Sequence, residues 1–300
     1  MELVAISKGY GLPATGTTGL VHSVFERAIN LSSVEKNGLL TTITSEEVDL
    51  PQGIRVITPT GFSFETIMVG EAFQFSNNAC HVGQLTIRLE TARVWRCDLP
   101  SLNLDLNHPQ AISAWKTVWI DLNHRQEAAK ATLQAKDLFN TRVSTEPGLS
   151  PKLIMAIRKL VDATQNLDLE LATTASTSLI GLGVGLTPSG DDFLVGFLAG
   201  LWCQLNREKD FSSFREQLGK RIIQKAQATN AISRTFLHYA AQGQVSSHLE
   251  GLTREISSPT SQQTLSKKSD LAMLVGASSG MDGVTGLLIG LGCIEKPWER

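Results

Sequence analysis

The chain has 300 residues, of which 42% are hydrophobic and 19% charged, and a formal net charge of −2. This composition is ordinary for a soluble globular protein and excludes wholesale disorder. A nearly neutral chain without runs of lysine or arginine lacks the basic face that nucleic acids require and the basic patch typical of membrane-surface proteins. We therefore expect neither a nucleic-acid partner nor a membrane partner.

The N-terminal residues and the cysteines indicate a cytoplasmic protein. Residues 1–5 contain no basic stretch that leads into an apolar segment, so no secretory signal is expected. The most apolar stretches, 193–205 and 284–294, are too short to span a bilayer. Widely spaced cysteines without a C-x-x-C motif are typical of reduced thiols, and this description fits all four: Cys80, Cys97, Cys203 and Cys293.

The first hundred residues are expected to form strands. Residues 84–90 alternate three apolar side chains with polar ones, and this period of two indicates a half-buried strand. Residues 54–58 and 62–69 have a similar character and flank a turn-like segment at 59–61. Glycines make residues 11–19 loop-like. We predict a β-rich N-terminal domain over residues 1–105 that could close into a barrel.

Helical patterns begin after this domain. Pro109 stands where a first helical residue is expected. Residues 111–138 carry apolar side chains at helical spacing, which predicts one long helix. A second helix is expected to start at Ser150, with this serine as its N-cap.

The remaining helices are expected over 211–228 and 230–242, the latter closed by Gly243, with a polar loop over 257–268. Residues 106–300 are therefore predicted to form a mainly helical, glycine-rich domain, and the fold class is predicted to be α+β.

Two segments ninety residues apart repeat one pattern. Residues 189–200 and 279–290, aligned without gaps, are identical at six of twelve positions. The matching pairs are Ser189/Ser279, Gly190/Gly280, Asp192/Asp282, Gly196/Gly286, Leu198/Leu288 and Gly200/Gly290. A shared order of small and acidic residues ahead of an apolar run indicates two copies of one structural device.

Architecture alone could explain this device. A serine followed three residues later by an acid is a capping-box pattern, in which the two side chains satisfy backbone N–H groups at a helix start. The glycines spaced four apart would then let the two helices pack backbone to backbone. In this interpretation the repeat stabilises the fold and binds nothing.

A binding interpretation is that both helix starts face one cleft. Free backbone N–H groups and the positive end of the helix dipole attract phosphate or carboxylate groups. Glycines would let a ligand approach the main chain closely, and nearby hydroxyls would add donors. Asp191 and Asp192 would orient an amino or amide group or hold Mg²⁺ beside a phosphate. Two carboxylates favour a ligand that carries both hydrogen-bond donors and negative charge.

Residues 229–234 offer a further set of polar groups at one helix start. Thr229, Asn230 and Ser233 could donate hydrogen bonds, and Arg234 is the candidate cation for an anionic substrate. A solvated arginine is the simple alternative for Arg234.

Several familiar motifs fail in this sequence. Residues 185–190 match half of a phosphate-binding P-loop, but Asp191 replaces the required lysine. Residues 276–280 fit the G-x-S-x-G nucleophile elbow, but His248 is the last histidine, whereas the hydrolase histidine follows the serine. The six histidines show no metal-ligand spacing. These motifs therefore identify no P-loop, hydrolase or metal centre.

The segment from Gly181 to Gly196 resembles the bacterial family of formerly unknown function, loosely described as carboxylases, that includes the oxamate carbamoyltransferase subunit AllH of anaerobic allantoin degradation. The resemblance extends to residues 89–95, 229–233 and 276–290, and so across the chain. One departure is Ala277, where family members carry histidine before the two serines. A chemical role for that histidine would make the activity of this chain different or absent.

The resemblance implies carbamoyl transfer in purine catabolism, with oxalurate and phosphate interconverting with oxamate and carbamoyl phosphate. It implies a small anionic substrate such as carbamoyl phosphate or oxamate, other protein subunits in a complex, and no cofactor. The catalytic residues would be Asp191, Asp192, Ser279 and Asp282. The substrate-binding residues would be Gly183, Gly185, Thr187, Ser189, Gly190, Thr229, Asn230, Ser233, Arg234, Ser278 and Gly280.

Two other functions remain open at this point. The first is a carboxylase or ligase that uses Mg-ATP, with Asp191 and Asp192 as the metal ligands. The second is a scaffold or ligand-sensing subunit without catalysis, in which the repeated helices only pack against each other.

Overall fold

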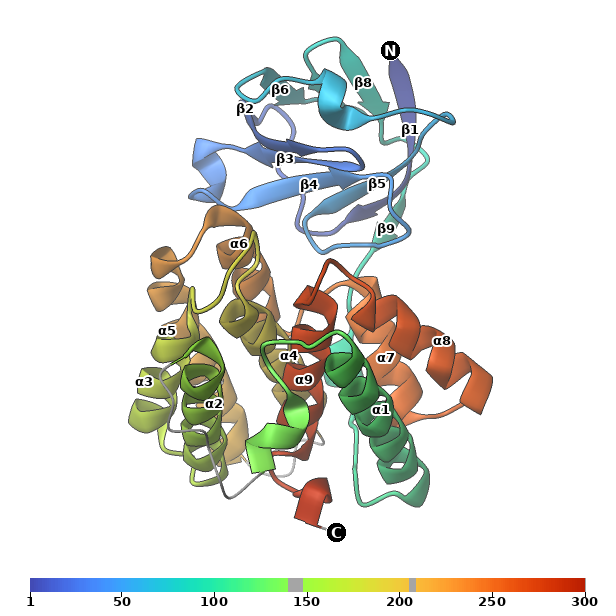
Figure 1. Cartoon of the computed structure of the whole chain (residues 1–300). Coiled ribbons are helices and arrows are strands. Elements are labelled where there is room, and N and C mark those ends of the chain that lie inside the picture. Colours follow the sequence, from blue (N-terminus) through green and yellow to red (C-terminus); the bar gives the residue numbers. More distant parts are fainter. Residues whose placement is uncertain (140–147, 205–208, 300) are drawn as a thin grey trace. The chain divides into compact units, whose positions relative to one another are not determined.

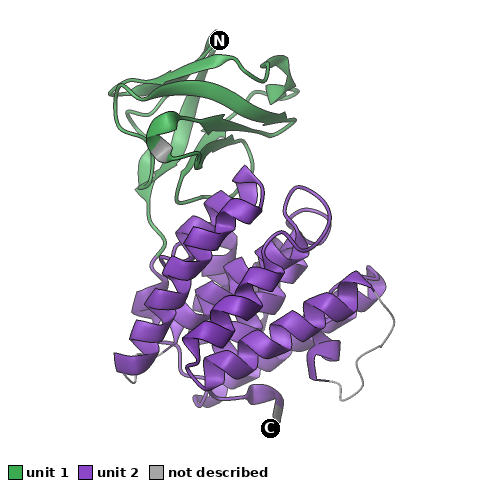
Figure 2. Cartoon of the chain, turned by 90° about the vertical axis from the view of Figure 1, so that its left-hand side faces the viewer, with its two compact units in different colours: residues 1–97 green, residues 98–300 purple. Residues whose placement is uncertain are grey.

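The computed structural model describes residues 1–139, 148–204 and 209–299. The chain divides into two compact units, Met1–Cys97 and Asp98–Arg300, shown in different colours in Figure 2. The fold class predicted from the sequence is confirmed, because unit 1 is a barrel-like sheet and unit 2 is helical.

Unit 1 is a single closed sheet. Its strands are β1 (Glu2–Gly9), β2 (Thr18–Phe25), β3 (Ala28–Ser32), β4 (Leu40–Thr44), β5 (Gly53–Ile57), β6 (Ala72–Phe75), β7 (Ala79–Val82), β8 (Leu85–Arg88) and β9 (Arg93–Trp95). They are ordered β5-β4-β3-β2-β6-β7-β8-β1-β9, and an added β5–β1 pairing closes the sheet. In that pairing β1 runs antiparallel to β5, with Val4 opposite Ile57, and it also runs parallel to β8, with Leu3 opposite Ile87.

The core of unit 1 follows the alternation read from the sequence. Leu85 and Ile87 of β8 and Leu3 and Ala5 of β1 are buried, whereas Val4 between the last two faces outward. One face of each strand therefore fills the interior of the barrel, as strand geometry requires.

The strand expected over residues 62–69 is wrong. The turn before it is present, because Phe62 N donates to Pro59 O at 3.1 Å. Residues Phe64–Thr66 then form a 3-10 helix, whose N-cap Ser63 accepts a hydrogen bond from Glu65 N. Phe64 is completely buried. A side-chain cap and one deep aromatic anchor outweigh the β propensity of this segment.

Unit 2 is a helical assembly around two central helices. Its helices are α1 (Pro109–Ala128), α2 (Leu149–Gln165), α3 (Leu169–Leu179), α4 (Ser189–Cys203), α5 (Lys209–Lys225), α6 (Ala231–Ala240), α7 (Ser247–Ser257), α8 (Gln262–Met273) and α9 (Ser279–Gly292). Figure 1 shows α4 and α9 side by side, with α1, α7 and α8 toward one side and α2, α3 and α5 toward the other. Among the described residues, no helix is long and apolar enough to cross a membrane.

Glycines bring α4 and α9 into backbone contact. A Cβ built on Gly196 would lie 1.8 Å from Gly283 O, and one on Gly286 would lie 2.0 Å from Phe193 O. Cβ atoms at Gly200 and Gly290 would also meet backbone atoms of the facing helix at less than 3 Å. The packing role that the sequence suggested for the repeated glycines is confirmed.

Several helix boundaries differ from the sequence-based expectations. The first helix starts at Pro109 as predicted but ends at Ala128 instead of Leu138, because Lys130 takes a left-handed φ of 50°. The second starts at Leu149 with Gly148 in the N-cap position, so Ser150 is not the cap. Asn230 caps α6 through its side chain, and Gly243 follows with φ 74° as a helix-ending residue.

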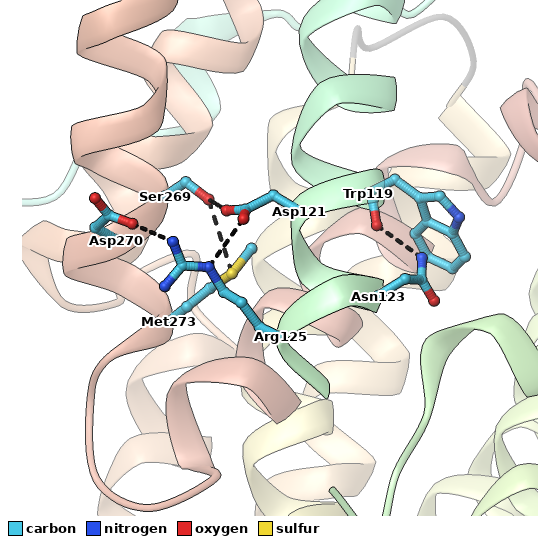
Figure 3. Close-up of polar contacts among 7 residues, drawn as sticks. All are labelled: Trp119, Asp121, Asn123, Arg125, Ser269, Asp270 and Met273. Atoms are coloured by element: carbon cyan, nitrogen blue, oxygen red, sulfur yellow. Dashed lines mark hydrogen bonds and ion pairs between the residues drawn. The ribbon is translucent and has the colours of Figure 1, made fainter. Parts of the chain in front are cut away.

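The polar loop expected over residues 257–268 is wrong. Most of it belongs to α8, whose N-cap Ser261 accepts a hydrogen bond from Thr264 N at 3.0 Å. Leu265 is buried, as are Ala272 and Met273 near the end of the helix. Figure 3 shows how α8 is held to α1: Arg125 donates to Asp121 and Asp270, and Ser269 donates to Asp121. These ion pairs are about one-third exposed, so each contributes only about 0.5 kcal/mol.

Candidate functional site

The two repeated helix starts lie together. α4 begins at Ser189 and α9 begins at Ser279, and the hydroxyl of Thr187, just before α4, lies 2.6 Å from the hydroxyl of Ser279. Because both helices start at this point, the positive ends of two helix dipoles meet there. This hydroxyl contact joins segments ninety residues apart in the sequence.

The capping-box interpretation of the repeat is wrong. The N-cap positions are Pro188 and Ser278, and neither helix has a side-chain cap hydrogen bond. Ser189 and Ser279 are instead the first helical residues, and the Ser279 hydroxyl bonds to Thr187. The serines and acids of the repeat therefore do not pair within their own helices.

Asp191 fastens two neighbouring segments to α4. Its Oδ1 accepts a hydrogen bond from Gly181 N at 2.8 Å, and its Oδ2 accepts one from the Thr229 hydroxyl at 2.6 Å. Burial raises the pKa of Asp191, and the hydrogen bonds from Thr229 and Gly181, together with the nearby Ser233 hydroxyl, oppose this shift. Both oxygens of Asp191 are thus used to hold the loop before α4 and the start of α6.

Asp192 and Asp282 are buried but poorly satisfied. Asp282 is 1% exposed, and both of its carboxyl oxygens and Oδ2 of Asp192 meet no partner in hydrogen-bond geometry. Burial raises the pKa of Asp192 to about 8, and the Ser279 and Thr187 hydroxyls nearby offset it only in part. Burial also raises the pKa of Asp282 to about 6, against the hydroxyls of Ser189 and Ser278. Buried polar atoms without partners are rare in folded proteins and mark candidate functional groups.

The structure describes no cation paired with these carboxyl groups. Within the described residues, no lysine or arginine forms an ion pair with Asp191, Asp192 or Asp282. The charged groups that influence the pKa of Asp192 are the other two carboxyls, which raise it further. Among the described residues, the carboxyl groups at the helix starts therefore have no paired cation, and bound protons would remove their charge.

Fewer backbone amides are free than the sequence suggested. Gly190 N donates to Leu182 O, and both Asp191 N and Asp192 N donate to Pro188 O. On the other helix, Gly280 N donates to Val275 O and Asp282 N to Ser278 O. The first residues of the helices, Ser189 and Ser279, have N–H groups without an acceptor inside their own helix. An anion bound at this point would therefore accept hydrogen bonds mainly from these two N–H groups and from the hydroxyls.

The predicted glycines differ in their surroundings. Cβ atoms at Gly190 and Gly280 would lie 2.1 Å from Leu179 O and 2.4 Å from Ala272 O, so close chain packing already requires glycine there. Gly183 has φ 142°, and a Cβ atom there would lie 2.4 Å from Ser189 N. Gly185 has φ 93°, and a Cβ atom there would have no neighbouring atom within 4 Å. Of these four, Gly185 leaves the most room for a ligand.

The predicted residues of α6 are mostly bonded within the chain. Asn230 caps α6 through its Oδ1 and donates from Nδ2 to Leu186 O at 2.9 Å, so it positions the loop before α4. Ser233 is buried near Asp191. Arg234 donates to Gln227 Oε1 at 2.9 Å and forms no ion pair with the three aspartates. The role of Arg234 as the cation for an anionic substrate stays a prediction.

A magnesium ion held by Asp191 and Asp192 stays a prediction. Both oxygens of Asp191 already accept hydrogen bonds, from Gly181 and Thr229. No group of three or more histidine, cysteine, aspartate or glutamate residues in the described part of the chain is arranged to hold a metal ion.

Sequence reasoning missed an apolar feature beside the helix starts. Val184, Leu186, Leu274 and Val275 lie on the two loops that lead into α4 and α9, and all four are exposed. The sequence did contain a signal for this feature, because aliphatic residues stand among glycines in segments that were expected to be loops.

Thr229→Val tests the anchoring role of Asp191. The variant removes the donor to Asp191 Oδ2 and leaves a buried carboxyl oxygen unsatisfied, so the free energy of unfolding should fall by about 1–3 kcal/mol. Urea denaturation measures the change. Thr229→Ser keeps the hydroxyl and should lose less than half as much, and equal losses for both variants would contradict the role given to this hydrogen bond.

Family models match both units of the chain. A model described as oxamate carbamoyltransferase subunit AllH matches residues 179–291, and a model described as the AllH family N-terminal domain matches residues 5–94. The chain belongs to the AllH family. The first AllH match extends from the end of α3 to α9 and so includes both helix starts, and the second covers the barrel-like sheet. No solved structure gives a significant match.

Proposed function

We propose that this chain is the subunit of an oxamate carbamoyltransferase-type enzyme that holds small anionic substrates at the starts of α4 and α9. The observation that supports this most is the junction of Thr187 and Ser279 beside two buried carboxyl groups without full hydrogen bonding. Hydroxyls, two helix dipoles and protonatable acids suit a small ligand that combines negative charge with amide donors. Oxamate, oxalurate and carbamoyl phosphate all have this combination.

The proposed reaction joins oxalurate and phosphate to give oxamate and carbamoyl phosphate. A phosphate oxygen attacks the carbamoyl carbon, the bond from that carbon to the oxamate nitrogen breaks, and a P–O–C bond forms. The proton lost by hydrogen phosphate balances the proton gained by the leaving nitrogen. Because amide nitrogen is a poor leaving group when unprotonated, the step needs an acid that keeps its proton near neutral pH.

Asp192 has the properties of this acid. Its carboxyl is buried, lies near the Thr187 and Ser279 hydroxyls, and has its pKa raised to about 8. In the proposal it donates a proton to the leaving nitrogen and then accepts the proton of the attacking phosphate. Asp282 orients the carbamoyl amide, while the Ser279 and Thr187 hydroxyls hold the oxygen on which charge develops. Asp191 is a positioning residue, since its hydrogen bonds are to the chain itself.

A thermal-shift screen tests the proposal, with the purified chain and the assembled complex each exposed to carbamoyl phosphate, oxamate, phosphate and Mg-ATP. Carbamoyl phosphate or oxamate should raise Tm, because at one hundred times its Kd a ligand stabilises the folded state by about 2.7 kcal/mol. Ser279→Ala should reduce the shift, whereas Ser178→Ala, an exposed serine on α3, should not. A shift with Mg-ATP alone would favour the ligase, and no shift in an active complex would favour the scaffold.

A further inference from the structure

Four exposed aliphatic side chains border the helix starts. Val184 and Leu186, in the loop before α4, are 80% and 60% exposed, and Leu274 and Val275, in the loop before α9, are 71% and 44% exposed. We call these four side chains the rim. Leu186 directly precedes Thr187, and Val275 O accepts the hydrogen bond of Gly280 N at 2.9 Å, so the rim comes from both loops that meet at the Thr187–Ser279 contact.

The loop that carries Leu186 is held in place by the chain. Asn230 Nδ2 donates to Leu186 O at 2.9 Å, and Asp191 accepts from Gly181 N at the beginning of the same loop. The side chain of Leu186 is therefore exposed to water on a loop that hydrogen bonds hold in place. Single exposed aliphatic residues are ordinary, but four around one polar site are characteristic of an interface.

Charge is the second observation. Residues 181–192 and 274–282, which form both loops and helix starts, contain three aspartates and no lysine or arginine. Asp192 and Asp282 have carboxyl oxygens without partners, and no described cation pairs with them. A site for anionic substrates needs positive charge to bind them and to stabilise charge during transfer. In the part of the chain that the structure describes, no lysine or arginine forms an ion pair with either carboxyl.

We propose that the rim is the docking surface for another subunit of the transferase, and that this subunit inserts an arginine or lysine toward Asp282, both of whose carboxyl oxygens lack a partner. The inference rests on the proposed function. The partner surface would be apolar around one basic side chain, complementary to aliphatic residues around buried acids. The rim would exclude water from the ion pair, as energetically neutral contacts do around an interface hot spot. Arginine fits best, because its planar guanidinium can bond to both carboxyl oxygens of Asp282 at once.

Cysteine labelling tests the docking surface without relying on activity. The native cysteines are all buried, so Leu186→Cys and Val275→Cys introduce one accessible thiol each. The control is Ile120→Cys on α1, where the native side chain is 56% exposed. A maleimide should react with all three variants of the isolated chain. After addition of the other purified transferase subunits, labelling at 186 and 275 should slow at least tenfold, with no change at 120.

Two labelling results would overturn the proposal. One is unchanged labelling at 186 and 275 in a complex that is assembled and active. The other is failure of both positions to react in the isolated chain, which would mean that this chain itself covers the rim. The proposed function fails separately, if no substrate shifts Tm in the thermal screen.

The inserted cation has its own readout. Asp282→Asn removes one charge with little change in shape, so Kd for the other subunits should rise about tenfold or more, and the salt dependence of association should weaken. Leu186→Asp should also raise Kd at least tenfold, and Ile120→Asp should not. Unchanged affinity and unchanged salt dependence in Asp282→Asn would show that no cation of the partner reaches this carboxyl.

Discussion

Asp192→Asn is expected to make the folded chain more stable at pH 7 while it abolishes turnover of the complex. Asparagine has the shape of a protonated aspartate but cannot lose a proton. The wild-type chain must keep Asp192 protonated in the folded state, or accept a charge in a buried place, and the variant avoids this cost. The pKa of about 8 would give several kcal/mol at full burial, and the partial exposure of Asp192 reduces the expected gain to about 1–3 kcal/mol.

The sign of the pH dependence follows from the raised pKa. Below about pH 4 both the folded and the unfolded chain bind the Asp192 proton, so stability does not change with pH through this group. Between about pH 4 and pH 8 the unfolded chain releases the proton and the folded chain keeps it. Stability contributed by the protonated group is therefore lost as pH rises through this window, and the variant should lose less of it.

Urea denaturation at several pH values, together with turnover of the assembled complex, measures both effects. The neighbouring Asp191→Ala is the contrasting variant: it removes the acceptor for Gly181 N and Thr229 Oγ1 and should destabilise the fold by about 1–3 kcal/mol. A non-catalytic scaffold predicts a different result for Asp192→Asn, namely lower stability with turnover per folded molecule unchanged. Wild-type turnover in a folded complex would remove Asp192 from the proposed chemistry.

Gly286→Ala is expected to have the largest effect on stability. The new Cβ would lie 2.0 Å from Phe193 O and 2.8 Å from Phe197 N, and both are backbone atoms inside α4. Neither can move without separating the two central helices. We expect the free energy of unfolding to fall by about 3 kcal/mol or more, which corresponds to severe overpacking of a core. Thermal or urea denaturation of the isolated chain measures this loss.

Gly283→Ala is the matched control on the same helix. A Cβ at Gly283 would meet only Asp192 O, at 3.7 Å, which is an ordinary contact. Replacing glycine with alanine inside a helix stabilises it by about 0.5–1 kcal/mol, so this variant should be neutral or slightly stabilised. If both alanine variants behaved alike, the close crossing of α4 and α9 would be wrong.

The sequence predicted the fold class well because local patterns were strong. Alternation over 84–90, Pro109 at the first helical position and Gly243 after a helix end are signals carried by neighbouring residues alone. The errors came from segments in which tertiary contacts determine the secondary structure. Phe64 is anchored in the barrel, and Leu265 helps to hold a polar helix against the rest of unit 2. The burial of these two side chains cannot be predicted from a short stretch of sequence.

The candidate site was predictable in outline but not in detail. The repeat of Ser-Gly-x-Asp revealed two equivalent helix starts, and the structure brings Thr187 and Ser279 together. The sequence could not tell which aspartate would be satisfied. Asp191 and Asp192 are adjacent, yet their side chains leave the helix in different directions, and only Asp191 meets donors from distant segments at both of its oxygens.

Hydrogen exchange in the assembled complex tests the central claim most directly. With saturating oxamate and phosphate, backbone amides in residues 187–192 and 278–282 should both exchange more slowly, because one ligand would contact both helix starts. Amides of α1 should be unaffected. If substrates saturate the enzyme while neither segment changes, or only one of them does, the two helix starts do not share a substrate.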